Sequence, residues 1–371
     1  MTKQKFLQPM WLELIIMLAA VAFAGVGLLM VSFLSRPGIS AGMNYGVIGL
    51  WLLAFFLISF SIALVSVLAG IGGSIIFTPV MMAFTPVNSL VIRATGLIIA
   101  MFGGLISTGV FMKKGIGNLK MCLILVVSQG LGAFIGAQCA IIETELLGDS
   151  GEGLIRIALG SILFVVAANF LTADKRYDWP DIQNVDAITK WMSLEHTYYE
   201  ESERRMHSYK ITRILLGLAF VFFAGFIGGF FGIGAGWAVT PIQNLALGVP
   251  LKAAAANSSI IIGMVNCVAV WPYMLAGGII PLFVLPWLSG KVAGGYLGAL
   301  VFVKVNVTTI RFILIGIMIY TSFQLITDGL AKYGVISKIP GRISLAIFLI
   351  IMVIDSLLLF SVQRKKRRRN Y

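Results

Sequence analysis

Two ten-residue stretches of this chain place glycine, threonine and proline at the same offsets inside apolar surroundings. Residues 70–79 have the sequence GIGGSIIFTP and residues 232–241 have GIGAGWAVTP, so the two copies lie 162 positions apart. Glycine and proline interrupt a helix, and an interrupted helix leaves backbone amides without partners. Such amides, together with helix N-termini, bind anions without many buried cations. The chemistry expected of these residues is therefore recognition of a small anion.

Lys291 adds a positive charge to the same chemistry. It lies in the middle of an apolar segment predicted at residues 279–302, ~12 residues from either end and too deep to reach the interface easily. Because a central lysine costs about 2.5–3.5 kcal/mol on insertion scales, we expect it to face a hydrated anion path. Gln129, its counterpart at the 162-residue offset, would offer a neutral amide. A structural ion pair between Lys291 and Asp355 is the alternative.

Other polar side chains in the apolar segments have simpler explanations. Arg93 lies only a few residues into its segment, so its side chain is expected to snorkel to the membrane surface. Asn266, Thr108 and Ser107 either line the same cavity or join helices by hydrogen bonds, and the sequence does not decide between these roles.

The composition places these residues in a membrane protein. Hydrophobic residues make up 59% of the chain, charged residues 12%, and the mean hydropathy is +0.97, whereas soluble domains carry about 25% charged residues. The alternating pattern of a membrane β-barrel does not occur. The predicted fold class is an all-α polytopic membrane protein. Helices able to cross a membrane are predicted at residues 11–34, 45–86, 89–112, 118–142, 153–172, 213–248, 252–276, 279–302, 306–327 and 341–362.

The segments 45–86 and 213–248 are too long for one crossing, and each contains one motif copy. Residues 70–137 align without gaps onto residues 232–299, which indicates internal duplication. If each long segment breaks at its glycines and returns to the same side, the positive-inside rule is satisfied. The halves are then inverted repeats with broken or re-entrant helices. In that topology the cytoplasmic side holds both termini, Lys113, Lys114, Lys304 and residues 173–212, and the acidic loop 143–152 lies outside.

The net charge of +13 is explained by topology rather than by nucleic acid. A basic run at residues 364–369 directly follows the last apolar segment, as cytoplasmic flanks of membrane helices do. Contact with anionic lipid is a lesser alternative. We therefore expect the lipid bilayer as a partner and no nucleic acid.

Five regions are predicted. Both histidines, His196 and His207, lie in the third of them, which is expected to be a solvated helix near the membrane surface rather than a metal site. The regions are an uncleaved N-terminal transmembrane helix and loop (1–44), the first membrane repeat (45–172), a cytoplasmic linker (173–212), the second membrane repeat (213–327), and a C-terminal transmembrane helix with its basic tail (328–371).

Enzyme chemistry is not expected of this chain. It contains no P-loop, dinucleotide fingerprint, metal-ligand cluster or nucleophile elbow, so neither a cofactor nor a metal is predicted. Without a nucleotide motif, transport would be secondary or facilitated. Cys122, Cys139 and Cys267 fall within apolar segments and are interpreted as small buried hydrophobes, with a redox or sulfur-relay role as the alternative.

The motif copies, with Ala-Thr-Gly-Leu at residues 94–97 and Ala-Asn-Ser-Ser at 256–259, resemble the twice-repeated signature of the sulfite exporter TauE/SafE family. The resemblance covers residues 45–327. It implies an inner-membrane permease for small anions, chiefly sulfite and organosulfonates, built from inverted repeats. Ser74 stands where the family has a third glycine, and Asn257-Ser258 stands where it has Thr-Ser. These differences bear on the precise substrate.

The function predicted from the sequence is a multi-pass permease that moves a small sulfur-containing anion by alternating access at a midplane site. A membrane scaffold or assembly protein that uses residues 173–212, or a passive anion channel, is the alternative, and a homodimer is left open. The residues expected to bind substrate are Gly72, Gly73, Thr78, Pro79, Thr95, Gln129, Gly234, Gly236, Thr240, Pro241, Asn257, Ser258, Ser259 and Lys291.

Overall fold

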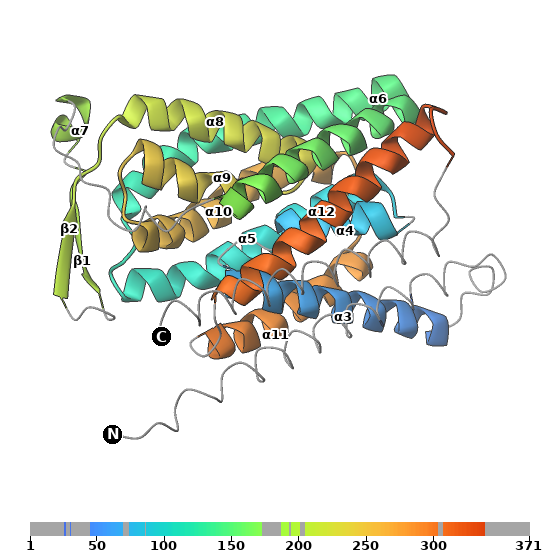
Figure 1. The fold of residues 1–371 in the computed structure, drawn as a ribbon, viewed down its shortest axis with the longest axis horizontal. Helices are drawn as coiled ribbons and strands as arrows, with labels where there is room; N and C mark the ends of the chain where they lie inside the picture. The colour runs from blue at the N-terminus through green and yellow to red at the C-terminus, as the bar shows by residue number, and fades with distance from the viewer. Residues whose placement is uncertain are drawn as a thin grey trace, which may run out of the picture.

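The fold is an all-α bundle of membrane-spanning helices, apart from a short hairpin outside it (Figure 1). The computed structural model describes residues 26, 30, 45–69, 74–85, 87–172, 187–192, 194–200, 205–302 and 307–337. The segments predicted at residues 341–362 and at most of 11–34 lie outside this part, as do the first-motif glycines, Gly72 and Gly73.

Six stretches of the described helices are long and apolar enough to cross a membrane. The protein is therefore a multi-pass membrane protein, and its helices follow the predicted segments closely. They are α3 (Tyr45–Ala69), α4 (Ser74–Phe84), α5 (Ser89–Lys113), α6 (Leu119–Thr172), α8 (Ile214–Phe231), α9 (Gly236–Pro241), the π-helix η3 (Ile242–Ala246), α10 (Leu251–Leu275), α11 (Pro281–Phe302) and α12 (Val307–Lys332).

Helix α6 consists of two spans joined at Gly148. This glycine has φ 53° and ψ −127°, a conformation that side chains with a Cβ rarely adopt. The acidic loop expected at residues 143–152 is instead helical on both sides of this residue. A longer loop is not needed, because a single glycine in this conformation can reverse the chain. The Gly148 turn lies beside the end of α12, because the Tyr333 hydroxyl donates to the carbonyl of Ser150, and the end of the bundle at which α6 meets the end of α12 (Figure 1) is here called the Gly148 end.

The second long segment enters the bundle and returns to the end it came from. Helix α8 stops at Phe231, and its C-cap, Gly232, has φ 65°. Helices α9 and η3 then lead back until the backbone amide of Thr212 donates a hydrogen bond to the carbonyl of Leu247, 3.1 Å away. The Leu247 side chain also packs against Gly217 in the first turn of α8. This segment is therefore re-entrant.

Helices α5 and α10 match residue for residue at the 162-residue offset, and they run antiparallel to each other. The start of α5 lies beside the end of α10, because the Arg93 guanidinium is 5.6 Å from the ring centre of Tyr273. The other ends also meet, since the amide of Asn118, just beyond α5, donates to Asn257 Oδ1 at 2.8 Å. Equivalent helices that run in opposite directions are what inverted repeats would produce.

In each half, one helix packs against a helix of the other half. Helix α6 packs on α8, and the Phe222 carbonyl oxygen lies closer than any ordinary contact to the point at which a Cβ on Gly132 would stand. Helix α11 packs on α3, where the Phe60 carbonyl lies in the same way against Gly294. Gly132 and Gly294 are equivalent at the repeat offset, and so are Phe60 and Phe222. Because small residues let membrane helices approach closely, this repeated contact holds the halves together.

The linker is not the solvated helix expected from its composition. Its described part contains the short helix α7 (Ala187–Trp191) and an antiparallel hairpin of β1 (His196–Glu200) and β2 (Arg205–Tyr209), in which His196 pairs with Tyr209. Alternating residues of the hairpin point to the membrane domain, so Tyr198 is 1% exposed and Tyr199 is 48% exposed. This period of two favours a strand over a helix. The hairpin marks the second end of the bundle, the linker end (Figure 1).

Two hydrophobic cores fill the bundle. One lies among α5, α6, α8 and α10 and extends into the hairpin through Leu194, Tyr198 and Tyr209. The other joins α3, α4, α11, α12 and the second span of α6 around the fully buried Trp287. The two motifs meet between these cores.

Candidate functional site

The motif copies of the two halves touch each other through hydroxyl groups. Thr78 in α4 donates to the carbonyl of Gly232 at 2.7 Å, and Ser74 donates to the carbonyl of Ile233 at 2.6 Å. Both carbonyls belong to the break after α8, where Gly232 and Gly234 have positive φ values of 65° and 63°. Hydroxyl groups of one half therefore satisfy backbone freed by the helix break in the other half.

Asn266 of α10 brings a further polar group to this contact. Its Nδ2 atom lies 3.5 Å from the point where a Cβ on Gly234 would stand, and Ser74 Oγ lies 3.2 Å from that point. The side chain is 2% exposed, and its Nδ2 has no hydrogen-bond acceptor in the described part of the chain. Because the Ser74 and Thr78 hydroxyls already donate to backbone carbonyls, the Asn266 amide is the neutral donor left at this contact among the described residues.

Lys291 belongs to α11, and its side chain lies against α5, about one helical turn along α5 from the contact between the motifs. Its Cε and Nζ atoms are 3.1 and 3.7 Å from the point where a Cβ on Gly103 would stand. Ala100, which contacts the Gly234 position, is about one turn of α5 from Gly103. The ammonium is thus near the motif contact, and its role in anion binding stays a prediction. Asp355, the alternative partner, lies outside the described residues.

Gln129 is fully buried at the interface of α6 and α8, against Gly225. Neither its amide oxygen nor its amide nitrogen has a hydrogen-bond partner in the part of the chain that the structure describes. A buried amide without partners costs free energy, and its role in binding substrate stays a prediction.

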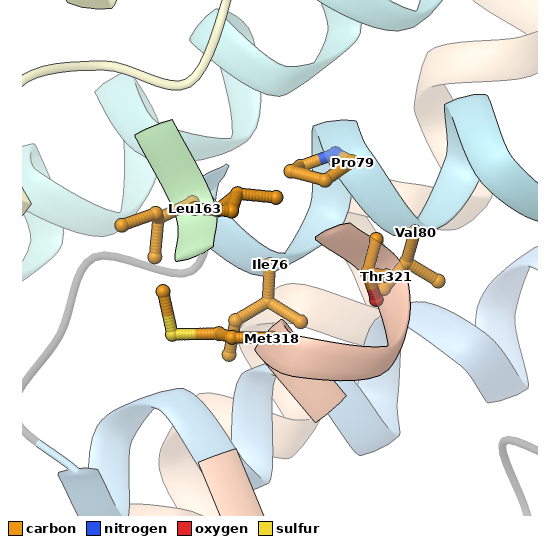
Figure 2. Close-up of a pocket in the computed structure, with 7 residues that line it drawn as sticks. Ile76, Pro79, Val80, Leu163, Met318 and Thr321 are labelled. Atoms are coloured by element: carbon orange, nitrogen blue, oxygen red, sulfur yellow. The ribbon is translucent and has the colours of Figure 1, made fainter. Parts of the chain in front are cut away.

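Pro79 lies away from these polar groups. It lines an apolar crevice with Ile76 and Val80 of α4, Leu163 of α6, and Met318 and Thr321 of α12 (Figure 2). This crevice is too narrow to hold a water molecule and has almost no polar lining. It suits helix packing rather than anion binding.

The remaining predicted residues are distributed along the helices. Thr95 and Ser259 donate to the carbonyls of Val91 and Ala255 in the preceding turn of their own helices, and Ser258 is buried. In the returning arm, Gly236 begins α9 and is half-buried, Thr240 is half-buried and Pro241 is exposed. None of these six has a contact that distinguishes substrate binding from helix packing.

Asn257 belongs to a second polar group at the linker end. Its Oδ1 accepts hydrogen bonds from the amide of Asn118 at 2.8 Å and from the thiol of Cys122 at 3.5 Å. Along α10, Asn257 and Asn266 are separated by nine residues, which corresponds to about 13 Å. The predicted residues therefore fall at two depths of the bundle.

Arg93 is wholly buried, so the expectation that it snorkels to the surface was wrong. Its guanidinium donates to the carbonyl of Phe230 at 3.4 Å, to Thr144 Oγ1 at 3.2 Å and to Ser89 at the start of its own helix. Tyr273 donates to the same end of α8 through the carbonyls of Gly229 and Phe230. Arg93 and Tyr273 together satisfy the last carbonyls of α8, directly before the glycine break. The charge within an apolar segment was the signal available in the sequence, but the face it occupies was not.

Comparison with known proteins agrees with a membrane transport architecture. The family described as sulfite exporter TauE/SafE matches residues 54–325. The probable membrane transporter protein YunE of Bacillus subtilis is 28% identical over 271 residues, covering 71% of this chain and 93% of the relative. A probable membrane transporter protein of Haemophilus influenzae is 25% identical over 265 residues, covering 71% of this chain and 90% of the relative. No solved structure matches the chain significantly.

Proposed function

Because the chain belongs to the sulfite exporter TauE/SafE family, we propose that this membrane transporter is a secondary permease for a small sulfur-containing anion, such as sulfite or an organosulfonate. The observation that carries the proposal is the contact between the two motif copies, in which Thr78 and Ser74 bond the broken backbone at Gly232 and Ile233. Broken backbone at membrane depth is stable where protein groups or a polar cavity satisfy it.

The substrate site is assigned to the centre of the bundle. Asn266 supplies a buried amide without an acceptor in the described part of the chain. Lys291 of α11 lies against Gly103, about one turn along α5 from Ala100 beside this amide. Neutral donors with one nearby cation attract an oxyanion without binding it so tightly that it cannot leave. Gln129, equivalent to Lys291, is assigned to the same path from the other half.

Alternating access follows from the same architecture as part of the proposal. The Asn266 amide nitrogen has no contact with solvent, so the described conformation is closed around it. Movement of one re-entrant arm against the crossing of α5 and α10 would open the centre to one end of the bundle at a time. The linker end is assigned to the cytoplasm of the inner (plasma) membrane by the positive-inside rule.

Reconstituted protein tests this function. Proteoliposomes containing the full chain should take up radiolabelled sulfite, sulfonate or thiosulfate faster than empty vesicles, with saturation at high concentration. Lys291→Gln should slow this uptake. If none of the three anions moves faster than in empty vesicles, the substrate class is wrong. Single-channel current steps in a planar bilayer would instead favour a passive channel, because a transporter turns over too slowly to produce them.

The scaffold alternative depends on the linker, and the hairpin limits it. Leu194, Tyr198 and Tyr209 of the linker are buried against the membrane domain, so only the opposite face, with Tyr199 and Met206, can receive a partner. A linker face already used for internal packing favours a role within the transporter.

A further inference from the structure

The hairpin inserts one tyrosine hydroxyl among side chains of the membrane domain at the linker end. Tyr209, the last residue of β2, is 7% exposed, and its hydroxyl faces the side chains of Asn118 and Asn257 without a hydrogen bond of normal geometry to either. Asn118 precedes α6 and is 4% exposed, and Asn257 in α10 is fully buried. Three elements far apart in the sequence therefore meet at one polar group.

The unused atoms of the two asparagines are hydrogen-bond donors. Asn118 Oδ1 accepts from the amide of Met121 at 3.1 Å, and Asn257 Oδ1 accepts from the amide of Asn118 at 2.8 Å. These bonds fix the orientation of both amide groups. Both Nδ2 atoms are buried and have no acceptor in the described part of the chain. The Tyr209 hydroxyl is also buried and has no hydrogen-bond partner of normal geometry there. What remains is two amide donors and a hydroxyl group that can donate as well as accept.

The local field also favours a negative guest. Asn118 caps the N-terminus of the long helix α6, because its side chain accepts from Met121 and its carbonyl accepts from Cys122. The helix therefore directs its partial positive charge at this position. Burial raises the pKa of the Tyr209 phenol, so the hydroxyl keeps its proton and stays a donor at neutral pH.

A bound water is a poorer match than an anion. A water oxygen accepts at most two hydrogen bonds, fewer than the three donors present, and both asparagine oxygens already accept backbone hydrogen bonds, which leaves the Tyr209 oxygen as an acceptor for a water proton. An oxyanion only accepts, so it can use both amides and the phenol at once.

From this arrangement we propose that Asn118, Asn257 and Tyr209 form a second subsite for a small oxyanion at the linker end, completed by a residue of the linker. The proposal rests on the proposed transport function for the identity of the anion, and it places the subsite about 13 Å along α10 from Asn266. The hairpin thereby contributes to substrate recognition. Its docking is held by the hydrogen bond of 3.0 Å between His196 Nε2 and the carbonyl of Gly115.

The test measures sulfite binding and sulfite flux with the full chain in lipid nanodiscs and proteoliposomes. Tyr209→Phe removes one hydroxyl and should weaken sulfite binding about tenfold, the usual loss for one hydrogen bond to a charged group. Asn257→Asp and Asn118→Asp keep the accepting oxygens but replace amide donors by negative charge, so each should abolish measurable binding at this subsite. Tyr199→Phe, on the exposed face of the same hairpin, is the matched control and should bind like the wild type.

The outcomes separate the subsite from the transport function. If Tyr209→Phe lowers the melting temperature but leaves sulfite affinity unchanged, the group binds only water or serves packing, and the subsite is refuted. If the wild type carries no sulfite, sulfonate or thiosulfate, the transport proposal fails. Weakened sulfite binding in Tyr209→Phe nanodiscs would still support the oxyanion subsite in that case.

Discussion

Three asparagine amide nitrogens, those of Asn118, Asn257 and Asn266, are buried in the described part of the chain without acceptors. An unsatisfied buried donor typically costs about 1–3 kcal/mol, so a protein that keeps three of them gains when a ligand supplies the acceptors. Lys291 differs from these neutral amides because it carries a positive charge. Recognition of the anion at the residue scale is thus expected to depend on several donors and one cation.

Replacing Arg93 by glutamine should destabilise the protein and slow anion uptake. Hydrogen bonds to a charged group contribute about 1.5–3 kcal/mol each, and Arg93 holds the end of α8 at the break. Arg93→Lys keeps the charge but not the planar fork, so its effect should be intermediate. Thermal unfolding in detergent measures the change, with Lys120→Gln, on an exposed position of α6, as the control. Unchanged melting of Arg93→Gln would show that the capping role is wrong.

Exchanging the two equivalent residues Lys291 and Gln129 tests whether their positions share one path. Lys291→Gln alone should reduce sulfite uptake about tenfold, equivalent to ~1.4 kcal/mol of lost attraction. The double variant Lys291→Gln with Gln129→Lys moves the charge across the repeat and should recover part of that uptake. Initial rates in proteoliposomes provide the measurement. A double variant no faster than the single one, although equally well folded, would argue that Gln129 does not face the path.

At the scale of elements, glycines decide how closely the helices approach. A Cβ on Gly104 would lie 2.5 Å from the backbone nitrogen of Gly263, so the crossing of α5 and α10 requires a glycine there. Gly132 and Gly294 make the equivalent contacts of α6 with α8 and of α11 with α3. These contacts form the frame against which, in our proposal, a re-entrant arm moves.

Gly104→Ala should therefore separate α5 from α10 and lower both the melting temperature and the transport rate. Gly109→Ala on the same helix is the matched control, because nothing lies within 4 Å of its added Cβ. That variant should be neutral or more stable, since alanine is favoured over glycine in a helix by about 1 kcal/mol. Differential scanning fluorimetry of the two variants checks the prediction. Equal melting temperatures for both would contradict the close crossing.

At the scale of the whole molecule, the contacts order the loops into two ends. The turn at Gly115 contacts His196 of the hairpin, and Leu247 contacts Thr212, so both belong to the linker end. Tyr333, just after α12, donates to the carbonyl of Ser150 beside the Gly148 turn, so these residues share the opposite end. The halves are related as inverted repeats in our proposal because α5 and α10 connect these ends in opposite directions.

Single cysteines introduced in a cysteine-free variant should report this topology. Gly115→Cys should react with a membrane-impermeant maleimide from one side only, and Ser150→Cys and Gly277→Cys, which are exposed like Gly115, should react from the other. Sealed right-side-out and inverted vesicles distinguish the sides, and the linker end is expected to be cytoplasmic. Labelling of positions 115 and 277 from the same side would rule out the inverted arrangement.

Several features of the fold could be predicted from residue patterns alone. The limits of α5 and α10, and the division of the second long segment at its glycines, follow from hydrophobic length and from glycine, which act locally. The hairpin could not be predicted as readily, because its alternation of buried and exposed residues is short and lies within a polar linker. Arg93 was misjudged since depth along a helix is readable but the face that a residue occupies depends on its neighbours.

The sequence by itself determined that this is a multi-pass all-α membrane protein with a duplicated glycine motif, since hydrophobic length and repetition are properties of the chain. Only the tertiary structure decided which polar groups meet. Thr78 reaches Gly232, Lys291 lies against Gly103, and Tyr209 faces Asn118 and Asn257. These contacts join residues far apart in the chain, and they depend on how closely the glycine-lined helices pack.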